Sequence, residues 1–167
     1  MAETVAALDC GTNTLRLLVA TTDETGRLVE FDRQLRFAGL GQGVDATGQF
    51  ADEAMERGWA IVDEYLPVIK RLGATRARFV ATSAARDASN RQVFFDGVRE
   101  RLGIDPELIS GQEEAQLSFN GAISGARTDG DPVLVMDSGG GSTELVHGTA
   151  AGEISQSVSL DIGSRRV

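Results

Sequence analysis

The sequence predicts an α/β protein, and three observations lead to that class. Glycine is frequent, with 20 residues, whereas aromatic residues make up only 5%, a composition that suits many tight turns. Short apolar runs of strand length alternate along the chain with stretches of helical periodicity. A unit of strand, aspartate, glycine turn and strand stands near the start of the chain and occurs again after residue 132.

The N-terminal part predicts three strands followed by a long helix. Apolar runs over 5–8 and 15–20 flank a glycine-bearing turn and predict a β-hairpin. Rough alternation over 27–37 predicts a third strand, and the four glycines within 39–48 predict a loop. A helix is expected over 51–72 because its apolar residues recur at spacings of three and four. Those residues are Met55, Trp59, Val62, Leu66 and Ile69.

The helices and strands expected after residue 72 are shorter. They lie on either side of a polar, turn-rich segment, 125–132, which we interpret as a linker. Before it, strand, helix, strand and helix are expected over 78–82, 90–102, 108–109 and 112–123. After it, strands are expected over 133–136, 145–146 and 154–160.

Composition and charge exclude several classes of protein. The 167 residues are 41% hydrophobic, which is enough to bury a core. The net charge of −9 argues against nucleic-acid binding, which needs a basic surface. Cys10 is the only cysteine, so no internal disulfide is possible, and no apolar run reaches the length of a membrane span. We therefore expect a cytoplasmic protein with no nucleic-acid or membrane partner.

The first glycine turn, residues 9–14, is a candidate phosphate loop. Gly11 lets the backbone approach an anion, and successive N–H groups with the hydroxyl of Thr12 can surround phosphate oxygens. Asp9, at the strand end, can bind the water shell of a metal ion or orient a nucleophile. A plain hairpin turn with Asx hydrogen bonds explains the same residues, so this turn alone does not decide.

The second turn, residues 137–144, is more specific. Three consecutive glycines are costly to order, and a backbone that wraps a phosphate group supplies a reason for them. Asp137 and Glu144 flank the loop, and two carboxylates beside a phosphate are a common way to hold Mg²⁺. A flexible hairpin with solvated acids is the alternative. Neither turn has the lysine of a Walker loop or the helix that follows a dinucleotide-binding motif.

A third polar segment, residues 82–90, follows a predicted strand and precedes a predicted helix. Arg86 suits a phosphate clamp, because its planar guanidinium matches phosphate oxygens. Ser89 or Asn90 is a candidate cap for the helix.

A fourth segment, residues 110–115, places Glu113 and Glu114 in the first turn of a predicted helix. The helix dipole favours acids at that position, which is reason enough for their presence. A carboxylate near two phosphate loops is also a natural general base for activating water. Spacing alone leaves both interpretations open.

Five segments, taken in this order, resemble the exopolyphosphatase / guanosine pentaphosphate phosphohydrolase family. They are AALDCGTNTLRLLVA, RFAGLGQGVDATG, ATSAARDASN, ISGQEEAQLSFNG and VMDSGGGSTELV, and the match covers nearly the whole chain. Ser138 departs from the bulky aliphatic residue that the family usually shows before its three glycines. We expect that departure to change packing only.

The resemblance implies the actin-like ATPase and sugar-kinase architecture, of ribonuclease H-like type, with two similar α/β domains and the active site between them. Residues 1–127 would form a nearly complete first domain with phosphate loop 1. Residues 128–167 would form the opening strands of the second domain with phosphate loop 2. Family members continue well beyond the residue that matches Val167, so we expect a truncated chain that is inactive alone.

The resemblance also implies roles for individual residues. Glu114 matches the family's water-activating glutamate, and Asp137 and Glu144 match its metal-linked acids, with Asp9 as a further expected metal ligand. The expected substrate-binding residues are Gly11, Thr12, Asn13, Arg36, Arg86, Gly139, Gly140, Gly141, Ser142 and Thr143.

The activity implied in this way is release of terminal orthophosphate from inorganic polyphosphate, with Mg²⁺ or Mn²⁺ as cofactor. Guanosine pentaphosphate is the alternative substrate, and the acidic net charge weakly favours short phosphate chains. An ATPase or phosphotransferase of the same superfamily and a non-catalytic phosphate sensor are further alternatives. A homodimer is compatible with this assignment.

Overall fold

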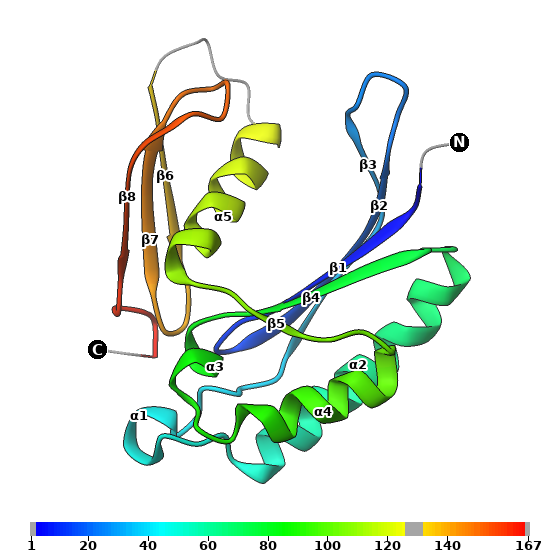
Figure 1. The fold of residues 1–167 in the computed structure, drawn as a ribbon, viewed down its shortest axis with the longest axis vertical. Coiled ribbons are helices and arrows are strands. Elements are labelled where there is room, and N and C mark those ends of the chain that lie inside the picture. The colour runs from blue at the N-terminus through cyan, green and yellow to red at the C-terminus, as the bar shows by residue number, and fades with distance from the viewer. Residues whose placement is uncertain (1–2, 126–131, 166–167) are drawn as a thin grey trace. The chain divides into compact units, whose positions relative to one another are not determined.

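The computed structural model describes residues 3–125 and 132–165, which belong to two compact units, Met1–Leu108 and Ile109–Val167 (Figure 1). The division falls before helix α5 (Gly111–Gly125), because α5 packs on the strands of the second unit. The sequence instead placed a domain boundary after residue 127. The predicted linker over 125–132 lies almost wholly outside the described residues.

The first unit is built on a five-stranded sheet in the order β3-β2-β1-β4-β5. Its strands are β1 (Val5–Cys10), β2 (Thr14–Thr22), β3 (Leu28–Phe37), β4 (Arg76–Ala81) and β5 (Glu107–Leu108). Strands β1, β2 and β3 are antiparallel neighbours, whereas β4 runs parallel to β1 and to β5. The ends of β1 and β4 therefore meet at one edge of the sheet, which is where the first glycine turn lies.

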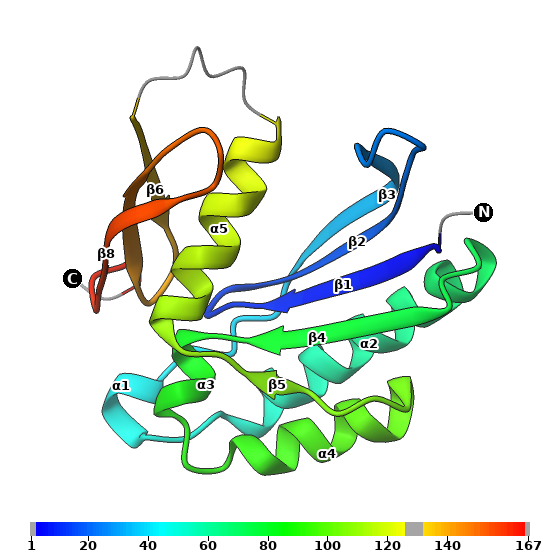
Figure 2. The same ribbon diagram turned by 45° about the horizontal axis from the view of Figure 1, so that its top comes forward.

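Four helices belong to the first unit: α1 (Val44–Thr47), α2 (Asp52–Arg71), α3 (Ser83–Asp87) and α4 (Arg91–Leu102). The two long helices, α2 and α4, cover one face of the sheet (Figure 2). Alternate residues of β1 and β2 point to that face and are buried, and complete burial of such an aliphatic side chain stabilises by about 1.5–3 kcal/mol. Phe94 lies at the centre of an aromatic cluster with Phe50, Trp59 and Phe79.

The second unit is smaller and holds a three-stranded antiparallel sheet in the order β6-β7-β8. The strands are β6 (Val133–Ser138), β7 (Thr143–Gly148) and β8 (Ile154–Leu160). One face of this sheet packs against α5 through the buried Ala115, Phe119 and Val146. On the opposite face, Leu134 and Met136 each keep 66% of their surface exposed. A groove of about 390 Å³ runs over that face between Leu134 and Val158.

The predicted pattern of strands and helices is confirmed, with three local differences. The loop expected over 39–48 contains one helical turn, α1, and the polar segment after β4 contains a second short helix, α3. The capping prediction for α4 is wrong, because neither side chain caps that helix. Asn90 instead bonds both N and O of Phe50, at 2.8 and 3.0 Å, and Ser89 donates to the carbonyl of Gly48.

Within the described ranges no helix is both long and apolar enough to cross a bilayer.

Candidate active site

The second glycine turn closes the hairpin between β6 and β7 and brings two acids together. Asp137 and Glu144 are direct cross-strand partners, so their Cβ atoms lie about 4.5–5.5 Å apart. The next pair toward the turn is Ser138 with Thr143, and the N–H of Gly139 donates to the carbonyl of Ser142 at 2.9 Å. By strand alternation, both acids point to the face of the sheet that α5 covers.

Glu144 is buried, with only 2% of its surface exposed. The hydroxyl of Ser159, its partner on β8, donates to Glu144 Oε1 at 2.8 Å. Among the described residues every buried side-chain oxygen has a hydrogen-bond partner, and no described group donates to Glu144 Oε2. That second oxygen therefore keeps the small solvent contact of this side chain. A carboxylate in this state can accept one further ligand at low cost.

Asp137 accepts a hydrogen bond from helix α5. The hydroxyl of Ser118, in the middle of α5, donates to Asp137 Oδ2. Glu114 precedes Ser118 by four residues, so the two side chains lie on the same face of the helix. The structure thus places the predicted base on the helix face that reaches the predicted metal-linked acids.

The two neighbouring glutamates of α5 differ in environment. Glu113 is exposed, and its N–H donates to Ser110 Oγ at 3.1 Å, which caps the helix. Glu114 is half-buried. The helix dipole therefore suffices to explain the exposed Glu113, whereas Glu114 is partly withdrawn from water on the side of α5 that carries Ser118. The spacing from Ser110 to Glu113 is that of a capping box, a signal of this helix start that the sequence itself carries.

The second loop is braced by the segment after β8. Ser164 and Arg165 donate their N–H groups to the carbonyls of Gly139 and Gly140, at 3.0 and 2.8 Å. Gly163 lies so close that a Cβ there would stand 2.5 Å from the carbonyl carbon of Gly140. Only glycine fits at this position.

The first glycine turn is tied into its own sheet edge. The N–H of Gly11 donates to the carbonyl of Thr14 at 2.9 Å, which closes the turn. The side chain of Thr12 is buried and shares a hydrogen bond of 3.0 Å with Ser83, the first residue of α3. Gly41 packs on Thr12, since a Cβ at Gly41 would lie 2.1 Å from Thr12 Cγ2. The carbonyl of Asn13 accepts the N–H groups of Ala38 and Gly39.

The two arginines predicted to bind substrate have different surroundings. Arg86 is half-buried on α3, and this helix starts beside the first turn because the N–H of Thr82 donates to the carbonyl of Cys10 at 3.1 Å. Arg36 donates to three acceptors within its own unit, the side chains of Glu64 and Gln34 and the carbonyl of Leu35. Binding substrate through Arg36 would require these bonds to be exchanged.

The expected metal ligands fall into two groups. Asp9 belongs to the first unit, where it stands 3.7 Å from Arg16, whereas Asp137 and Glu144 belong to the second. The described residues contain no cluster of three or more His, Cys, Asp or Glu side chains suited to a metal ion. Two hard carboxylates with a free oxygen each nevertheless fit Mg²⁺, which keeps several waters and is commonly held by one or two carboxylates plus substrate phosphates.

Cys10 is excluded as a nucleophile. It is 3% exposed, and its burial, together with the negative charge of Asp9, raises the pKa of the thiol far above its ordinary value. The thiol is therefore protonated at neutral pH, and a protonated thiol is a weak nucleophile.

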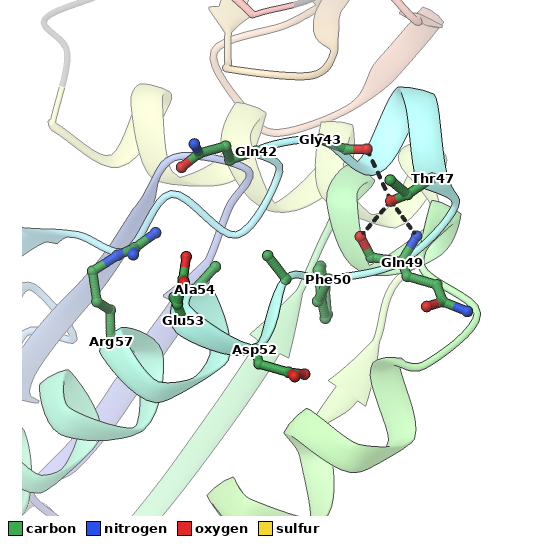
Figure 3. Close-up of a pocket in the computed structure, with 10 residues that line it drawn as sticks. Gln42, Gly43, Thr47, Gln49, Phe50, Asp52, Glu53, Ala54 and Arg57 are labelled. Atoms are coloured by element: carbon green, nitrogen blue, oxygen red, sulfur yellow. Dashed lines mark hydrogen bonds between the residues drawn. The ribbon is translucent and has the colours of Figure 1, made fainter.

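A pocket of about 440 Å³ lies in the first unit between α1 and the start of α2 (Figure 3). Arg57 and Glu53 direct their charged ends toward the side on which Gln42 lies, whereas Asp52 and Gln49 point away (Figure 3). The pocket adjoins the first turn, because Gly41, next to Gln42, donates its N–H to the carbonyl of Thr12 at 2.8 Å.

Comparison with known proteins decides the family. The family model described as "Ppx/GppA phosphatase family" matches residues 18–167. The chain belongs to the Ppx/GppA phosphatase family. It is 46% identical over 171 residues to exopolyphosphatase 2 of Mycobacterium tuberculosis, a match that covers 98% of this chain and 53% of the relative. The chain therefore spans about half the length of this relative.

Solved Ppx/GppA structures have the same fold. An exopolyphosphatase-like protein superposes with a TM-score of 0.94 at 46% identity, covering 99% of this chain and 52% of that one. The Aquifex aeolicus family member gives a TM-score of 0.83 at 30% identity, covering 98% of this chain and 52% of that one. The predicted actin-like α/β architecture is confirmed by these neighbours and by the mixed sheet of the first unit.

Proposed function

We propose that the complete protein is a metal-dependent phosphohydrolase that releases terminal orthophosphate from inorganic polyphosphate. The observation that carries this proposal is the acid pair of Asp137 and Glu144 beside a glycine loop, with Glu114 on the helix face that reaches it. Membership of the Ppx/GppA family and the name of the M. tuberculosis relative support it.

In the proposed mechanism, Glu114 accepts a proton from a water molecule as the water oxygen attacks the terminal phosphorus. The bridging P–O bond breaks in line with the attack, and the shortened chain leaves. Backbone N–H groups of the second glycine loop would bind the phosphoryl oxygens, where negative charge must be stabilised. Asp137 and Glu144 would hold Mg²⁺, which neutralises phosphate charge when bound.

The direct test is orthophosphate release from polyphosphate by a protein that contains this chain at the length of its relatives, with Mg²⁺ present. Steady release, one phosphate at a time from the chain end, is the expected result. Transfer of a labelled phosphate to an acceptor other than water would instead indicate a phosphotransferase. Binding of polyphosphate without turnover would indicate a sensor, and either result would overturn the proposal.

Guanosine pentaphosphate is a second candidate substrate, and the pocket beside the first turn favours it. Glu53 and Arg57 face the pocket while Asp52 points away, so the pocket offers no net positive charge to hold a continuing polyphosphate chain (Figure 3). A guanine base would suit it better, because Arg57 can donate to the base carbonyl while Glu53 accepts from the ring and amino N–H groups.

Glu53→Gln separates the two substrates. If the nucleotide is used through this pocket, the variant should raise the KM for guanosine pentaphosphate about tenfold and leave the KM for polyphosphate unchanged. Glu56→Gln is the matched control, since Glu56 is on the same helix but does not line the pocket. Equal KM values for the nucleotide in all three proteins would show that this pocket does not bind guanosine pentaphosphate.

A further inference from the structure

Two serine hydroxyls to which the sequence assigned no role contact the two acids that are proposed to hold the metal. Ser118, from α5, donates to Asp137, and Ser159, from β8, donates to Glu144. Each contact joins side chains far apart in sequence, 19 and 15 residues respectively. Each acid therefore has its own donor, and the two donors come from different elements.

The three strands align these groups in one row. Asp137 pairs with Glu144 across β6 and β7, and Glu144 pairs with Ser159 across β7 and β8. The start of α5 lies against the far end of the row, since a Cβ on Gly111 would stand 2.8 Å from Ser159 Oγ. The helix thus contacts the row at Ser159 through Gly111 and at Asp137 through Ser118.

A carboxylate has two equivalent oxygens and rotates freely unless one of them is held. A hydroxyl donates only one proton, so each serine can hold one oxygen and leaves the other available. The oxygens taken are Asp137 Oδ2 and Glu144 Oε1, and no described group donates to Asp137 Oδ1 or Glu144 Oε2. The available oxygens thereby acquire defined directions before any ligand is bound, which is how outer partners of metal ligands act.

We propose that Ser118 and Ser159 are positioning residues that orient Asp137 and Glu144 for a divalent cation. This inference rests on the proposed function, because it assumes that the two acids hold the metal. The substrate-facing groups are the acids and the loop; the serines act only through them.

The test measures Mn²⁺ binding directly, by electron paramagnetic resonance of the free ion, in the complete protein without substrate. Ser118→Ala and Ser159→Ala should each weaken Mn²⁺ binding about 10- to 100-fold, the range found when such outer partners are removed. Ser118→Thr and Ser159→Thr keep the hydroxyl and should recover most of the affinity. Circular dichroism of each variant confirms that the fold is retained.

Matched controls exist on the same two elements. Ser124→Ala removes an α5 hydroxyl that donates to the carbonyl of Gly121, and Ser155→Ala removes a β8 hydroxyl that donates to the carbonyl of His147. Both controls should bind Mn²⁺ as the unmodified protein does.

The acid variants Asp137→Asn and Glu144→Gln distinguish the two ways in which the inference can fail. If the acid variants lose Mn²⁺ while both serine-to-alanine variants bind it normally, the positioning role is wrong and the proposed metal site stands. If the acid variants also bind it normally, the metal site itself is wrong, and the positioning role falls with it.

Discussion

Asp137 and Glu144 face each other across the β6–β7 hairpin, with the glycine loop as the only chain between them. Their shared face is the one covered by α5, which also carries Glu114. Two carboxylates at this separation repel each other when both are ionised, unless a cation or hydrogen-bond donors compensate. Ser118 and Ser159 supply part of that compensation, and a bound cation would supply the rest.

The acid pair leads to a prediction about metal dependence. Asp137→Asn and Glu144→Gln should each raise the Mg²⁺ concentration needed for half-maximal activity by at least about tenfold, because each removes one hard anionic ligand. Titrating Mg²⁺ against the rate of phosphate release measures the effect. If the Mg²⁺ curves of the variants and the unmodified protein superimpose, neither residue binds the metal.

The bracing of the second loop leads to a prediction about Gly163. In Gly163→Ala the new Cβ would lie 2.5 Å from the carbonyl carbon of Gly140, so the loop backbone must shift. We expect a loss of about 1–3 kcal/mol in the free energy of unfolding, measured with urea, and a raised KM for substrate. Gly121→Ala is the control, since a Cβ on Gly121 meets nothing within 4 Å. An unchanged KM in Gly163→Ala would show that this contact does not shape the loop.

The glycine turns could be predicted from the sequence, whereas the serines that contact the two acids could not. Both turns, their flanking strands and the three-stranded second sheet follow from apolar patterning and glycine position, which are local signals. Ser118 reaches Asp137 only when α5 lies on the β6–β8 face, and Ser159 reaches Glu144 only through the pairing register of β7 with β8. Local patterns specify neither arrangement. A partial signal was present, because Ser118 follows Glu114 by one helical turn.

Two further differences have the same origin. The short helices α1 and α3 have only four and five residues, too few to show helical periodicity. Asn90 was expected to cap α4, but the backbone of Phe50 competes for its amide and binds both its donor and its acceptor. Long-range partners thus replaced the local hydrogen bond that the sequence favours.

Burial of Cys10 leads to a prediction about alkaline stability. The pKa of the thiol is raised in the folded protein, whereas in the unfolded chain it lies near its ordinary value of about 8.5. The unfolded state therefore loses a proton first, and stability falls as the pH rises above that value. Between pH 9 and 10 the free energy of unfolding should decrease by about 1.2 kcal/mol more than in Cys10→Ala. Equal pH slopes for the two proteins would contradict this.

The exposed face of the second sheet leads to a prediction about the 167-residue chain on its own. Leu134, Met136 and Val158 are exposed there at 66%, 66% and 45%, and the chain spans about half the length of its relatives. We expect this chain alone to show no significant phosphate release, because phosphoryl transfer depends on tight positioning from both sides. Rates are compared, per molecule and at equal Mg²⁺, with a protein of the relatives' length. Comparable rates would refute the requirement for the remaining half.

The proposed role of Glu114 is tested most directly by one measurement, steady-state phosphate release from polyphosphate by Glu114→Gln in the complete protein. The amide keeps the shape of the side chain but cannot accept the proton of the attacking water. We expect kcat to fall by at least about 100-fold, while KM changes by no more than about threefold. Glu113→Gln, which alters the exposed neighbour at the helix start, should keep its kcat. An intact kcat in Glu114→Gln would contradict the assignment of the base.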